Sequence, residues 1–333
     1  MNAPKCTAND YIDFLVASPR AVSGTAAARV QPAGADPPAH DAFTRRLHRL
    51  DPDPAVVWAA AAPLVQRDRG SLVLDDGTLD NPYARHIDVV TRHWSGKHRR
   101  VVPGINLLTL LWTDGDRLIP LDSRVYDKAT DGLTKNDHCR AMGTTAQPRG
   151  FPPECVVCDG WYASLEHLKA VRDAGWQWLT RLKSNRLVNP DGTDNRPLAA
   201  CAIAERGTRV HLQGDGVIQV CRIGAPDGDT EHWATSDLAL DELRRRQYGE
   251  WAWGSEEDHR GLKQHCGGER AQVRAARAQR TRIGCAIRAC LRLEWQRLTT
   301  GLSWWEAKTS IVREAVRAYL AAPSYTLPPP ATA

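Results

Sequence analysis

The spacing of hydrophobic residues predicts helices at the two ends of the chain and strands between them. In the N-terminal part, Phe43 and Leu47 stand four residues apart, which places both on one face of a helix. Asp53-Pro54 is a typical helix start, because the aspartate can cap the helix and the proline fits its first turn. Residues 9–66 are therefore expected to be mostly helical.

Short strands are predicted from residue 71 onward. Leu72 to Leu74 form an apolar run that ends in two aspartates and a glycine. Further along, Asp114-Gly115 is a strong hairpin turn between a long apolar run and an alternating segment. The expected elements are strands at 72–74, 101–112, 118–126 and 155–158, a helix at 164–174 and a strand at 176–183.

The second half of the chain changes character twice. Strand-like pieces with glycines between them indicate a β-rich insertion within residues 186–240. From a charged helix start at Ser255-Glu256, the chain is expected to be helical as far as Leu320. This order predicts an α/β fold, in which a mixed sheet is flanked by helices and carries a β-rich insertion and an N-terminal helical domain.

Composition and charge narrow the class of protein. The 333 residues are 42% hydrophobic, enough for a large core, and carry a formal charge of +5. Between His259 and Arg297, ten Lys and Arg residues face only two Glu residues, a local excess of eight positive charges. Such a segment suits a polyanionic partner such as DNA.

The cysteines and the apolar runs indicate the cellular compartment in which the protein works. Nine cysteines at irregular spacing, with no secretory signal and no run long enough to span a membrane, predict a reduced cytoplasmic protein without a membrane partner. Cys155 and Cys158 resemble half of a zinc site, but no second pair lies nearby. Because strand alternation sends their thiols to opposite faces, we interpret them as small buried hydrophobic residues.

Two aspartates stand at the ends of predicted strands. Asp76 and Asp159 are each followed by a glycine, and the functional groups of α/β sheets gather at such strand ends. If the fold brings two carboxylates close together, they repel each other unless a cation lies between them. Mg²⁺, with Mn²⁺ as a substitute, prefers such oxygen ligands and keeps water and phosphate groups in its shell. The pattern indicates metal-dependent phosphoryl transfer.

Glu256 is the candidate for a third metal ligand. Helical spacing puts Glu256, Arg260 and Lys263 on one face, where a metal ion and a neighbouring phosphate could be held together. The same spacing suits an ordinary solvated face with ion pairs between turns. Periodicity alone favours the solvated face over the metal site.

Six segments between residues 71 and 320 carry a specific resemblance. They read Leu72-Val-Leu-Asp-Asp-Gly-Thr, His93-Trp-Ser-Gly-Lys-His, Gly104-Ile-Asn-Leu-Leu-Thr-Leu-Leu-Trp, Cys158-Asp-Gly-Trp-Tyr, Thr180-Arg-Leu-Lys-Ser-Asn and Glu256-Glu-Asp-His-Arg-Gly-Leu-Lys. Together they resemble the bacterial insertion-sequence transposases of the DDE class, in the branch whose signature is Tyr, two residues, Arg, three residues, Glu, six residues, Lys. The resemblance implies an RNase H-like core that supplies Asp, Asp and Glu from its first strand, its fourth strand and a later helix.

Carried onto this chain, the resemblance implies that Asp76, Asp159 and Glu256 are the catalytic residues and metal ligands, and that Lys263 contacts DNA. The other expected DNA-binding residues are Arg260, Arg270, Arg274 and Arg277, with Arg45, Arg46 and Arg49 on a possible recognition helix. The expected parts are a helical, helix-turn-helix-like DNA-binding domain at 1–68, the first part of the core at 69–185, the insertion at 186–245, the C-terminal helical part of the core at 246–322 and a disordered tail at 323–333.

Some assignments stay open in the sequence. Asp75 is a rival to Asp76, since strand alternation does not choose between them and only the Asp-Gly-Thr pattern of the family favours Asp76. Glu257 is a weaker rival to Glu256, because the six-residue gap to the signature lysine selects Glu256. The signature arginine would fall at position 252, which is Ala252 in this chain.

Two segments are predicted to be poorly ordered. The resemblance requires a helix at residues 141–148, but Gly143, two threonines and Pro148 are weak helix formers. Residues 21–39 form a loose stretch rich in Ala, Gly and Pro. Both features favour a copy that folds poorly or no longer transposes.

Three functions follow from these observations. The leading hypothesis is a Mg²⁺-dependent transposase, associated with the nucleoid, that cuts double-stranded DNA at the ends of its element and joins the freed 3′-hydroxyl to target DNA. The family implies a homodimer on the DNA. The alternatives are a catalytically decayed or repurposed DNA-binding protein and an RNase H-fold nuclease for branched or hybrid substrates. Trp161 and Trp233 could stack on an unpaired base, although most tryptophans serve the core.

Overall fold

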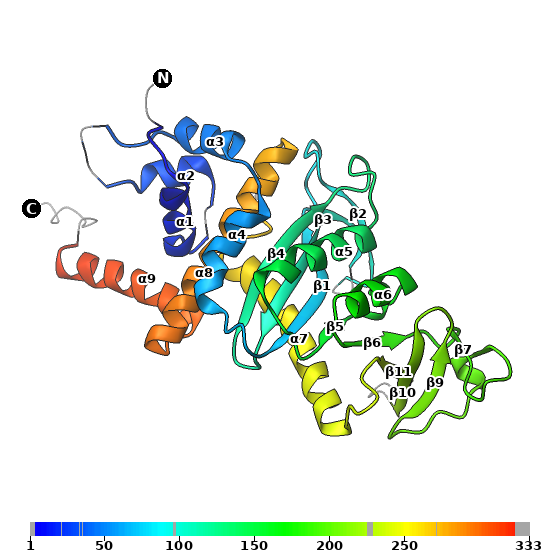
Figure 1. Ribbon diagram of the computed structural model, residues 1–333. Coiled ribbons are helices and arrows are strands. Elements are labelled where there is room, and N and C mark those ends of the chain that lie inside the picture. The colour runs from blue at the N-terminus through cyan, green and yellow to red at the C-terminus, as the bar shows by residue number, and fades with distance from the viewer. Residues whose placement is uncertain are drawn as a thin grey trace, which may run out of the picture.

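The computed structural model describes residues 4–20, 22–32, 34, 36–95, 98–224, 229–270 and 272–323 (Figure 1). Within these residues a nine-stranded mixed sheet has the strand order β2-β3-β1-β5-β6-β11-β10-β9, with β4 paired to β3. Its strands are β1 (Ser71–Asp80), β2 (Thr91–Ser95), β3 (Arg100–Thr113), β4 (Leu118–Tyr126), β5 (Val156–Cys158), β6 (Trp178–Leu182), β9 (Thr208–Leu212), β10 (Gly216–Gly224) and β11 (Thr230–Thr235). A separate ribbon pairs β7 (Leu187–Val188) with β8 (Arg196–Pro197).

Helices flank this sheet, as the sequence predicts. The α-helices are α1 (Ala8–Ala17), α2 (Gly24–Arg29), α3 (His40–Arg49), α4 (Pro54–Ala61), α5 (Lys135–Ala146), α6 (Leu165–Asp173), α7 (Glu242–His265), α8 (Ala276–Thr300) and α9 (Trp304–Ala321). Short 3₁₀ turns are η1 (Ala62–Leu64), η2 (Gln147–Arg149), η3 (Gly160–Tyr162) and η4 (Leu198–Ala200). The predicted α/β class is confirmed.

The predicted strand order is confirmed in the centre of the sheet. β3 and β4 form the hairpin around Asp114-Gly115, where Gly115 adopts a φ of 98° that favours glycine. β1 runs antiparallel to β3 and parallel to β5, and β5 runs parallel to β6. The parallel pairs need crossovers, which α5 and α6 supply. This arrangement brings the end of β5 beside the middle of β1.

The two faces of the sheet are covered by different helices (Figure 1). Leu74 of β1 and Cys158 of β5 pack in the main core with residues of α5 and α6, such as Cys139. Cys155 and Val157, on the opposite face of β5, pack with Tyr248 of α7. Cys155 and Cys158 therefore lie in different clusters, as strand alternation predicts. α5 and α6 cover one face of β1 and β5, and α7 covers the other.

Most of the insertion joins the central sheet, and the short β7–β8 ribbon stands apart from it. β11 pairs antiparallel with β6, and β10 and β9 follow it, so the predicted β-rich insertion extends the central sheet by three strands. The strand-like pieces predicted within residues 186–240 include β9, β10 and β11, so this part of the prediction is confirmed. The insertion is thereby fixed to the strand next to β5.

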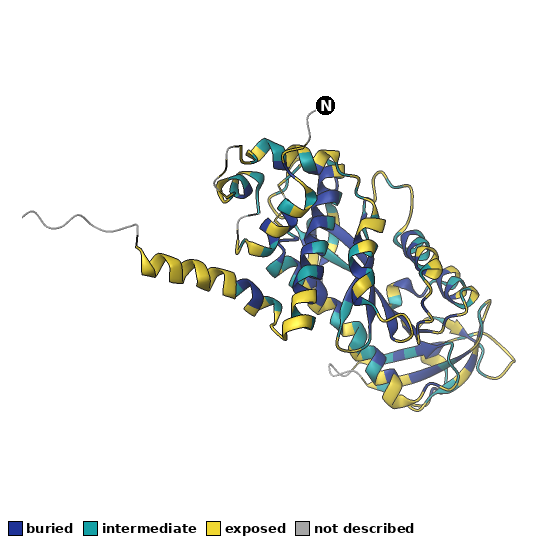
Figure 2. Ribbon diagram, turned by 60° about the vertical axis from the view of Figure 1, so that its left-hand side comes forward, coloured by how far each residue is buried: buried dark blue, intermediate teal, exposed yellow. Residues whose placement is uncertain are grey.

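The N-terminal helices share the main core. Phe43 and Leu47 of α3 are buried in the same cluster as Ile283 and Cys285 of α8. The limits of the five parts that the sequence suggests stay a prediction. At the other end of the chain, α9 leaves the body of the protein, and its exposed surface is continuous beyond Lys308 (Figure 2).

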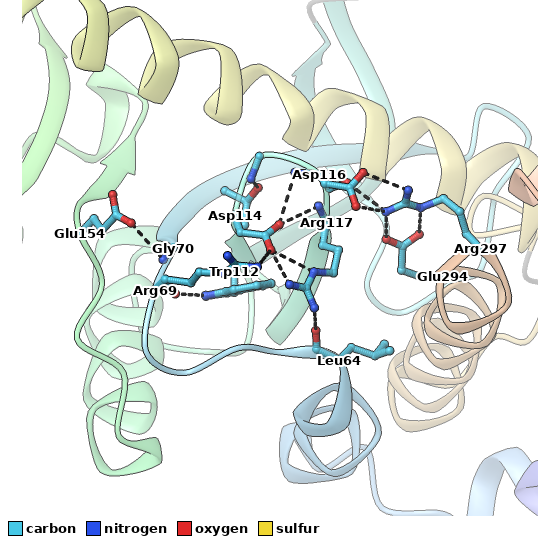
Figure 3. Close-up of polar contacts among 12 residues, drawn as sticks. Leu64, Arg69, Gly70, Trp112, Asp114, Asp116, Arg117, Glu154, Glu294 and Arg297 are labelled. Atoms are coloured by element: carbon cyan, nitrogen blue, oxygen red, sulfur yellow. Dashed lines mark hydrogen bonds and ion pairs between the residues drawn. The ribbon is translucent and has the colours of Figure 1, made fainter. Parts of the chain in front are cut away.

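The turn of the β3–β4 hairpin is tied to two neighbouring segments (Figure 3). Arg117 pairs with Asp114 at 2.5 Å, and its Nη1 donates to the carbonyl of Leu64 at 3.1 Å. Arg297 of α8 pairs with Asp116 at 3.1 Å. These contacts hold η1 and α8 at the end of the sheet where β1 begins.

The predicted helix start at Ser255 is wrong. α7 begins thirteen residues earlier, at Glu242, where the Asp241 side chain accepts from the Arg244 amide and caps the helix. Two glycines and three aromatic residues before Ser255 obscured the helical pattern in the sequence. Burial against the sheet outweighs their weak helix propensity.

The predicted break at residues 141–148 is also wrong. α5 continues through Gly143 to Ala146, because Thr134 and Asp137 form a capping box at its start and the Thr144 and Thr145 hydroxyls bond carbonyls one turn back. Likewise α2 lies within the stretch 21–39 that composition made look loose, with Ser23 as its cap. The predicted tail at 323–333 falls almost entirely outside the described residues.

Candidate active site

Two adjacent aspartates in the middle of β1 point to opposite faces of the sheet. Alternation along a strand puts Asp75 on the face that α7 covers and Asp76 on the face that α5 covers. In the parallel register, Leu74 stands opposite Cys158, so Asp159 follows at the level of Asp75. Asp159 directly follows β5, as predicted, but the prediction that Asp76 ends its strand is wrong, because β1 continues to Asp80.

The Asp76 carboxylate lies in a polar cluster. Lys135 Nζ, on the first residue of α5, donates to its Oδ2 at 2.8 Å, and Asn106 Nδ2 of β3 donates to the same oxygen at 2.6 Å. The hydroxyl of Tyr162 donates to Oδ1. Burial by itself would raise the pKa of Asp76, but the Lys135 charge and these hydrogen bonds outweigh it and hold the pKa below its usual value. Asp76 is therefore ionised.

Asp75 lies in the interface between β1 and α7. The buried Ser255 hydroxyl donates to Asp75 Oδ2 at 2.5 Å, and the Asp76 amide donates to Oδ1 at 2.8 Å. Burial is the largest cause that raises the pKa of Asp75, and the negative charges of Asp76 and Asp159 add to it. Together they raise the pKa to about 6, although the two hydrogen bonds act in the opposite direction. One turn along α7, His259 Nε2 lies 3.0 Å from Thr109 Oγ1 of β3.

Asp159 opens a tight turn after β5. Its side chain is 52% exposed, and Arg181 Nη2 of β6 lies 3.8 Å from it. Gly160 is required next, because a Cβ there would lie 2.6 Å from the Arg181 carbonyl. The turn ends at Tyr162, which is fully buried and bonds Asp76. Asp76 and the turn of Asp159 are thus directly connected.

Glu256 shares a side of α7 with Gly249, which faces β11 and β6. Glu256 follows Ser255, which faces β1, by about 100° around the helix. Gly249, two turns earlier on the same side, lies against the Trp233 ring, and Trp233 neighbours Arg181. Glu256 itself is exposed. Lys263 on this side is half-buried and pairs with Glu269 at 3.3 Å.

The three predicted carboxylates do not form a closed cluster, because Asp76 points to the face of the sheet that α5 covers, whereas Glu256 belongs to α7, which covers the other face. No group of three or more His, Cys, Asp or Glu residues is close enough to hold a metal ion within the described part of the chain. The donor chemistry nevertheless fits a divalent cation, because the groups are carboxylates and Asp76 is ionised.

The basic residues expected to bind DNA fall into two groups. On α8, Arg280 pairs with Asp131 and Arg292 with Asp13, while Arg282 is buried. These arginines hold the N-terminal and core segments together, so the basic run overstates the free charge. The exposed members of the predicted set are Arg260, Arg270, Arg274 and Arg277.

The predicted recognition helix is only partly accessible. On α3, Arg45 is exposed but pairs with Asp41 at 2.6 Å. Arg46 is half-buried, and its charge acts on Cys6 and Cys285 of the core. Arg49 is exposed.

Several residues of the site were missed in the sequence. Lys135, Asn106 and Ser255 have no motif of their own, and only the folded chain brings them to the aspartates. Tyr162 belongs to one of the segments that carry the family resemblance, but the sequence does not show that its hydroxyl bonds Asp76. Of the two tryptophans considered for base stacking, Trp161 is 63% exposed and Trp233 packs beside Tyr248.

The departure at position 252 has a packing reason. Ala252 packs against the cluster of Tyr248 and Leu179 between α7 and the sheet. Tyr248 is buried, and its hydroxyl donates to Glu154 at 3.3 Å. A small residue suits this crowded interface.

Comparison with known proteins identifies the family. The family described as DDE superfamily endonuclease matches residues 8–201, more than half of the chain. The chain belongs to the DDE superfamily of endonucleases. A second family, described as transposase DDE domain, matches residues 132–291. DDE enzymes of this kind are DNA transposases that depend on divalent metal ions.

A solved structure supports the fold of this DDE enzyme. The chain resembles the piggyBac transposase synaptic complex with hairpin DNA, with a TM-score of 0.51 and 11% identity over 98% of this chain and 74% of that one. No curated protein matches the chain significantly. Among the described residues, no helix is both long and apolar enough to cross a membrane.

Proposed function

We propose that this DDE transposase cuts double-stranded DNA at the ends of its element and joins the freed 3′-hydroxyl to target DNA, with Asp76, Asp159 and Glu256 as its catalytic carboxylates. The observation that carries the proposal is the bond from the Tyr162 hydroxyl to Asp76, because Tyr162 closes the turn that Asp159 opens. This bond couples carboxylates from two neighbouring strands, as a shared metal site requires.

Access supports Asp76 over Asp75 as the first carboxylate, because a metal ligand must be reachable by substrate. The Asp76 side chain is 20% exposed, whereas Ser255 closes over the Asp75 carboxylate. Charge does not separate the two, because the pKa of Asp76 lies below its usual value and that of Asp75 is raised only to about 6, so both are largely ionised at neutral pH. We assign Asp75 to holding α7 on β1, which sets the direction of Glu256.

The residues of the site divide the work. Asp76, Asp159 and Glu256 offer the carboxylate oxygens that Mg²⁺, or Mn²⁺ in its place, prefers. When bound, such ions would activate the attacking hydroxyl and neutralise charge on the phosphodiester. Lys135 keeps Asp76 ionised and fixes its direction.

DNA is the proposed partner of the basic residues near the site. Lys263 and the exposed Arg260, Arg270, Arg274 and Arg277 lie on α7, on α8 or between them, and would bind phosphates. Arg49 of α3 would add a contact from the N-terminal helices, with Arg45 and Arg46 on the same helix. The piggyBac transposase, whose fold is similar, was solved with hairpin DNA.

We also infer a homodimer on DNA. The outer half of α9 carries the exposed apolar residues Ile311, Val312, Val316, Tyr319 and Leu320. Val312, Val316 and Tyr319 stand at i, i+4 and i+7, so they share one face of a helix that leaves the body of the protein (Figure 2). A second copy of α9 would bury this face. Light scattering of the protein with and without DNA tests the assembly.

One experiment tests the catalytic proposal. Purified protein is incubated with a duplex of the terminal sequence that flanks its gene, without metal and with Mg²⁺ or Mn²⁺, and nicking and joining are measured. Wild-type protein should nick only with metal, while Asp76→Asn, Asp159→Asn and Glu256→Gln proteins should bind the duplex without nicking it. Binding without nicking by wild-type protein would identify a decayed or repurposed DNA-binding protein instead. Nicking of branched or hybrid substrates without end specificity would identify a nuclease.

A further inference from the structure

Four arginines from distant parts of the chain meet at one hollow. They are Arg20, Arg85, Arg270 and Arg274, and none of them has a carboxylate partner among the described residues. Arg270 Nη1 donates to the carbonyl of Arg20 at 2.8 Å, which leaves its charge in place. The paired arginines of α8 differ, because carboxylates of this chain neutralise them.

The hollow has a volume of about 690 Å³ and lies between three segments far apart in the sequence. The segment after α1, the loop after β1 and the connection from α7 to α8 form its walls. Two acidic residues also line it: Glu269 pairs with Lys263 at 3.3 Å, and Asp80 lies 2.8 Å from His98 Nε2. The four arginines outnumber these two carboxylates, so the hollow carries a positive charge.

The walls are fixed to one another by backbone contacts. The Asp80 amide donates to Glu269 Oε1 at 3.2 Å, and the Asp88 amide donates to the carbonyl of Arg274 at 3.0 Å. The Asp88 carboxylate in turn accepts from the Ala276 amide at 2.9 Å and caps α8. The basic side chains therefore stand on a preorganised frame, which lowers the entropy cost of binding.

Tyr83 stands at the rim of this hollow and is 94% exposed. The ring is therefore accessible from the hollow, and tyrosine offers both an apolar face and a polar hydroxyl to a ligand. Beside four guanidinium groups, the ring could pack on a sugar while its hydroxyl reaches a phosphate. The combination fits a nucleic acid backbone better than a small inorganic anion.

The position of the hollow relative to the active site follows from β1. Asp80 lies four residues beyond Asp76 on the same strand, which is roughly 13 Å at the rise of a β-strand. B-form DNA rises 3.4 Å per base pair, so this distance corresponds to about four steps of a duplex. A duplex cut at Asp76 could therefore reach the hollow with its continuing backbone.

We propose that this hollow binds phosphates of duplex DNA about four base pairs from the cleaved phosphodiester, with Arg20, Arg85, Arg270 and Arg274 as the phosphate ligands and Tyr83 against the sugar. The contact to duplex DNA rests on the charges and the frame of the hollow. The distance from the cut rests on the proposed function.

The first test measures salt dependence. Binding of a 25-base-pair duplex of mixed sequence is followed by fluorescence anisotropy at several salt concentrations for wild-type and Arg85→Ala/Arg274→Ala proteins. Removing two phosphate contacts should lower the slope of log K against log salt by about 2 and weaken binding roughly uniformly across sequences. Arg317→Ala, an exposed arginine of α9 paired with Glu314, is the control and should keep the wild-type slope. An unchanged slope in the double variant overturns the proposal.

The second test locates the contact. In the terminal duplex, one phosphate at a time is replaced by an uncharged methylphosphonate, and binding is compared between wild-type and Arg85→Ala proteins without metal. Neutralising phosphates three to five steps from the cut should weaken wild-type binding several-fold and leave the variant unaffected, because the contact is already lost. Equal losses in both proteins at every position overturn the placement.

The outcomes separate this proposal from the proposed function. If wild-type protein fails to nick with metal but the salt slope changes as expected, the catalytic proposal fails and the DNA surface stands. If nicking is normal and Tyr83→Ala and Arg85→Ala bind like wild type, the surface fails and the catalytic proposal stands. Competition by inorganic phosphate but not by duplex DNA would identify a small-anion site and also overturn the proposal.

Discussion

Asp75 and Asp76 are adjacent and chemically identical, yet their surroundings differ in kind. Asp76 lies among a lysine, an amide and a phenol that favour its charged form, so its pKa falls. Asp75 is enclosed between β1 and α7 with one hydroxyl and one amide, so burial raises its pKa to about 6. Strand alternation produces this division, because one residue must face each helix layer. On the proposed function, the two aspartates serve different purposes, Asp76 for chemistry and Asp75 for the position of α7.

Substitution of Asp76 should have the largest effect on nicking and should distinguish it from Asp75. Asp76→Asn keeps the shape but loses the charge, and nicking should fall by more than about 100-fold, beyond the loss typical for groups that only support a metal ligand. Gel assays of the terminal duplex with Mg²⁺ measure it, and DNA binding is the control. A nearly normal rate would remove Asp76 from the catalytic set.

Asp75→Asn and Ser255→Ala should each have a smaller effect. Both leave the catalytic carboxylates in place but loosen α7 on β1, so nicking should fall by about 10- to 100-fold, as for residues that orient a ligand. Their combined variant should lose little more than either one, since a single bond is removed. Losses that simply multiply in the double variant would show that the two residues act independently.

Alanine substitution of one glycine on each side of the sheet should change the free energy of unfolding in opposite directions. Gly77 faces α7, where a Cβ would lie 2.8 Å from His259 Nδ1, whereas a Cβ on Gly143 of α5 meets no atom within 4 Å. Gly77→Ala should therefore destabilise the protein by about 1–3 kcal/mol through overpacking. Gly143→Ala should stabilise it by up to about 1 kcal/mol, because alanine is the better helix former. Urea unfolding of both variants checks the opposite signs.

The smallest expected effect concerns pH. His167 of α6 is buried with neither ring nitrogen bonded among the described residues, and burial lowers its pKa to about 4. The folded state then holds neutral histidine, while the unfolded chain binds a proton below pH 6.5. Stability is lost as pH falls from 6.5 toward 4, by about 1 kcal/mol at pH 5.5. His167→Leu should remove this part of the loss between pH 7.5 and 5.5 in urea unfolding, and an equal loss in both proteins would contradict it.

The strands were largely predictable from sequence, but the site was not. Apolar runs and turn residues located β1, β3, β4 and β5, because such strands must be apolar where both faces are buried. Hydrophobic spacing could not find the true start of α7, because its first turns contain tryptophans and glycines that are helical only through their packing against the sheet. Nor could it decide between Asp75 and Asp76, since that choice depends on which helix covers which face. Lys135 became visible only when α5 was placed against β1.

The basic segment teaches a related lesson about charge. Counting arginines suggested a DNA-binding tail along α8, but the sequence could not show that Arg280 and Arg292 are paired within the chain. Long-range partners such as Asp13 decide which charges remain available. Only the folded chain separates Arg270 and Arg274 from the structural arginines.

The match between α7 and β1 also limits how such chains can change in length. Ser255 bonds Asp75, and His259 lies over Gly77, so four helical residues span the same distance as two strand residues, roughly 6 Å in each case. One residue inserted between Ser255 and His259 would rotate the rest of α7 by about 100° and turn Leu262 away from the core. Insertions between relatives should therefore gather outside this interval, in loops such as the one before Asp241.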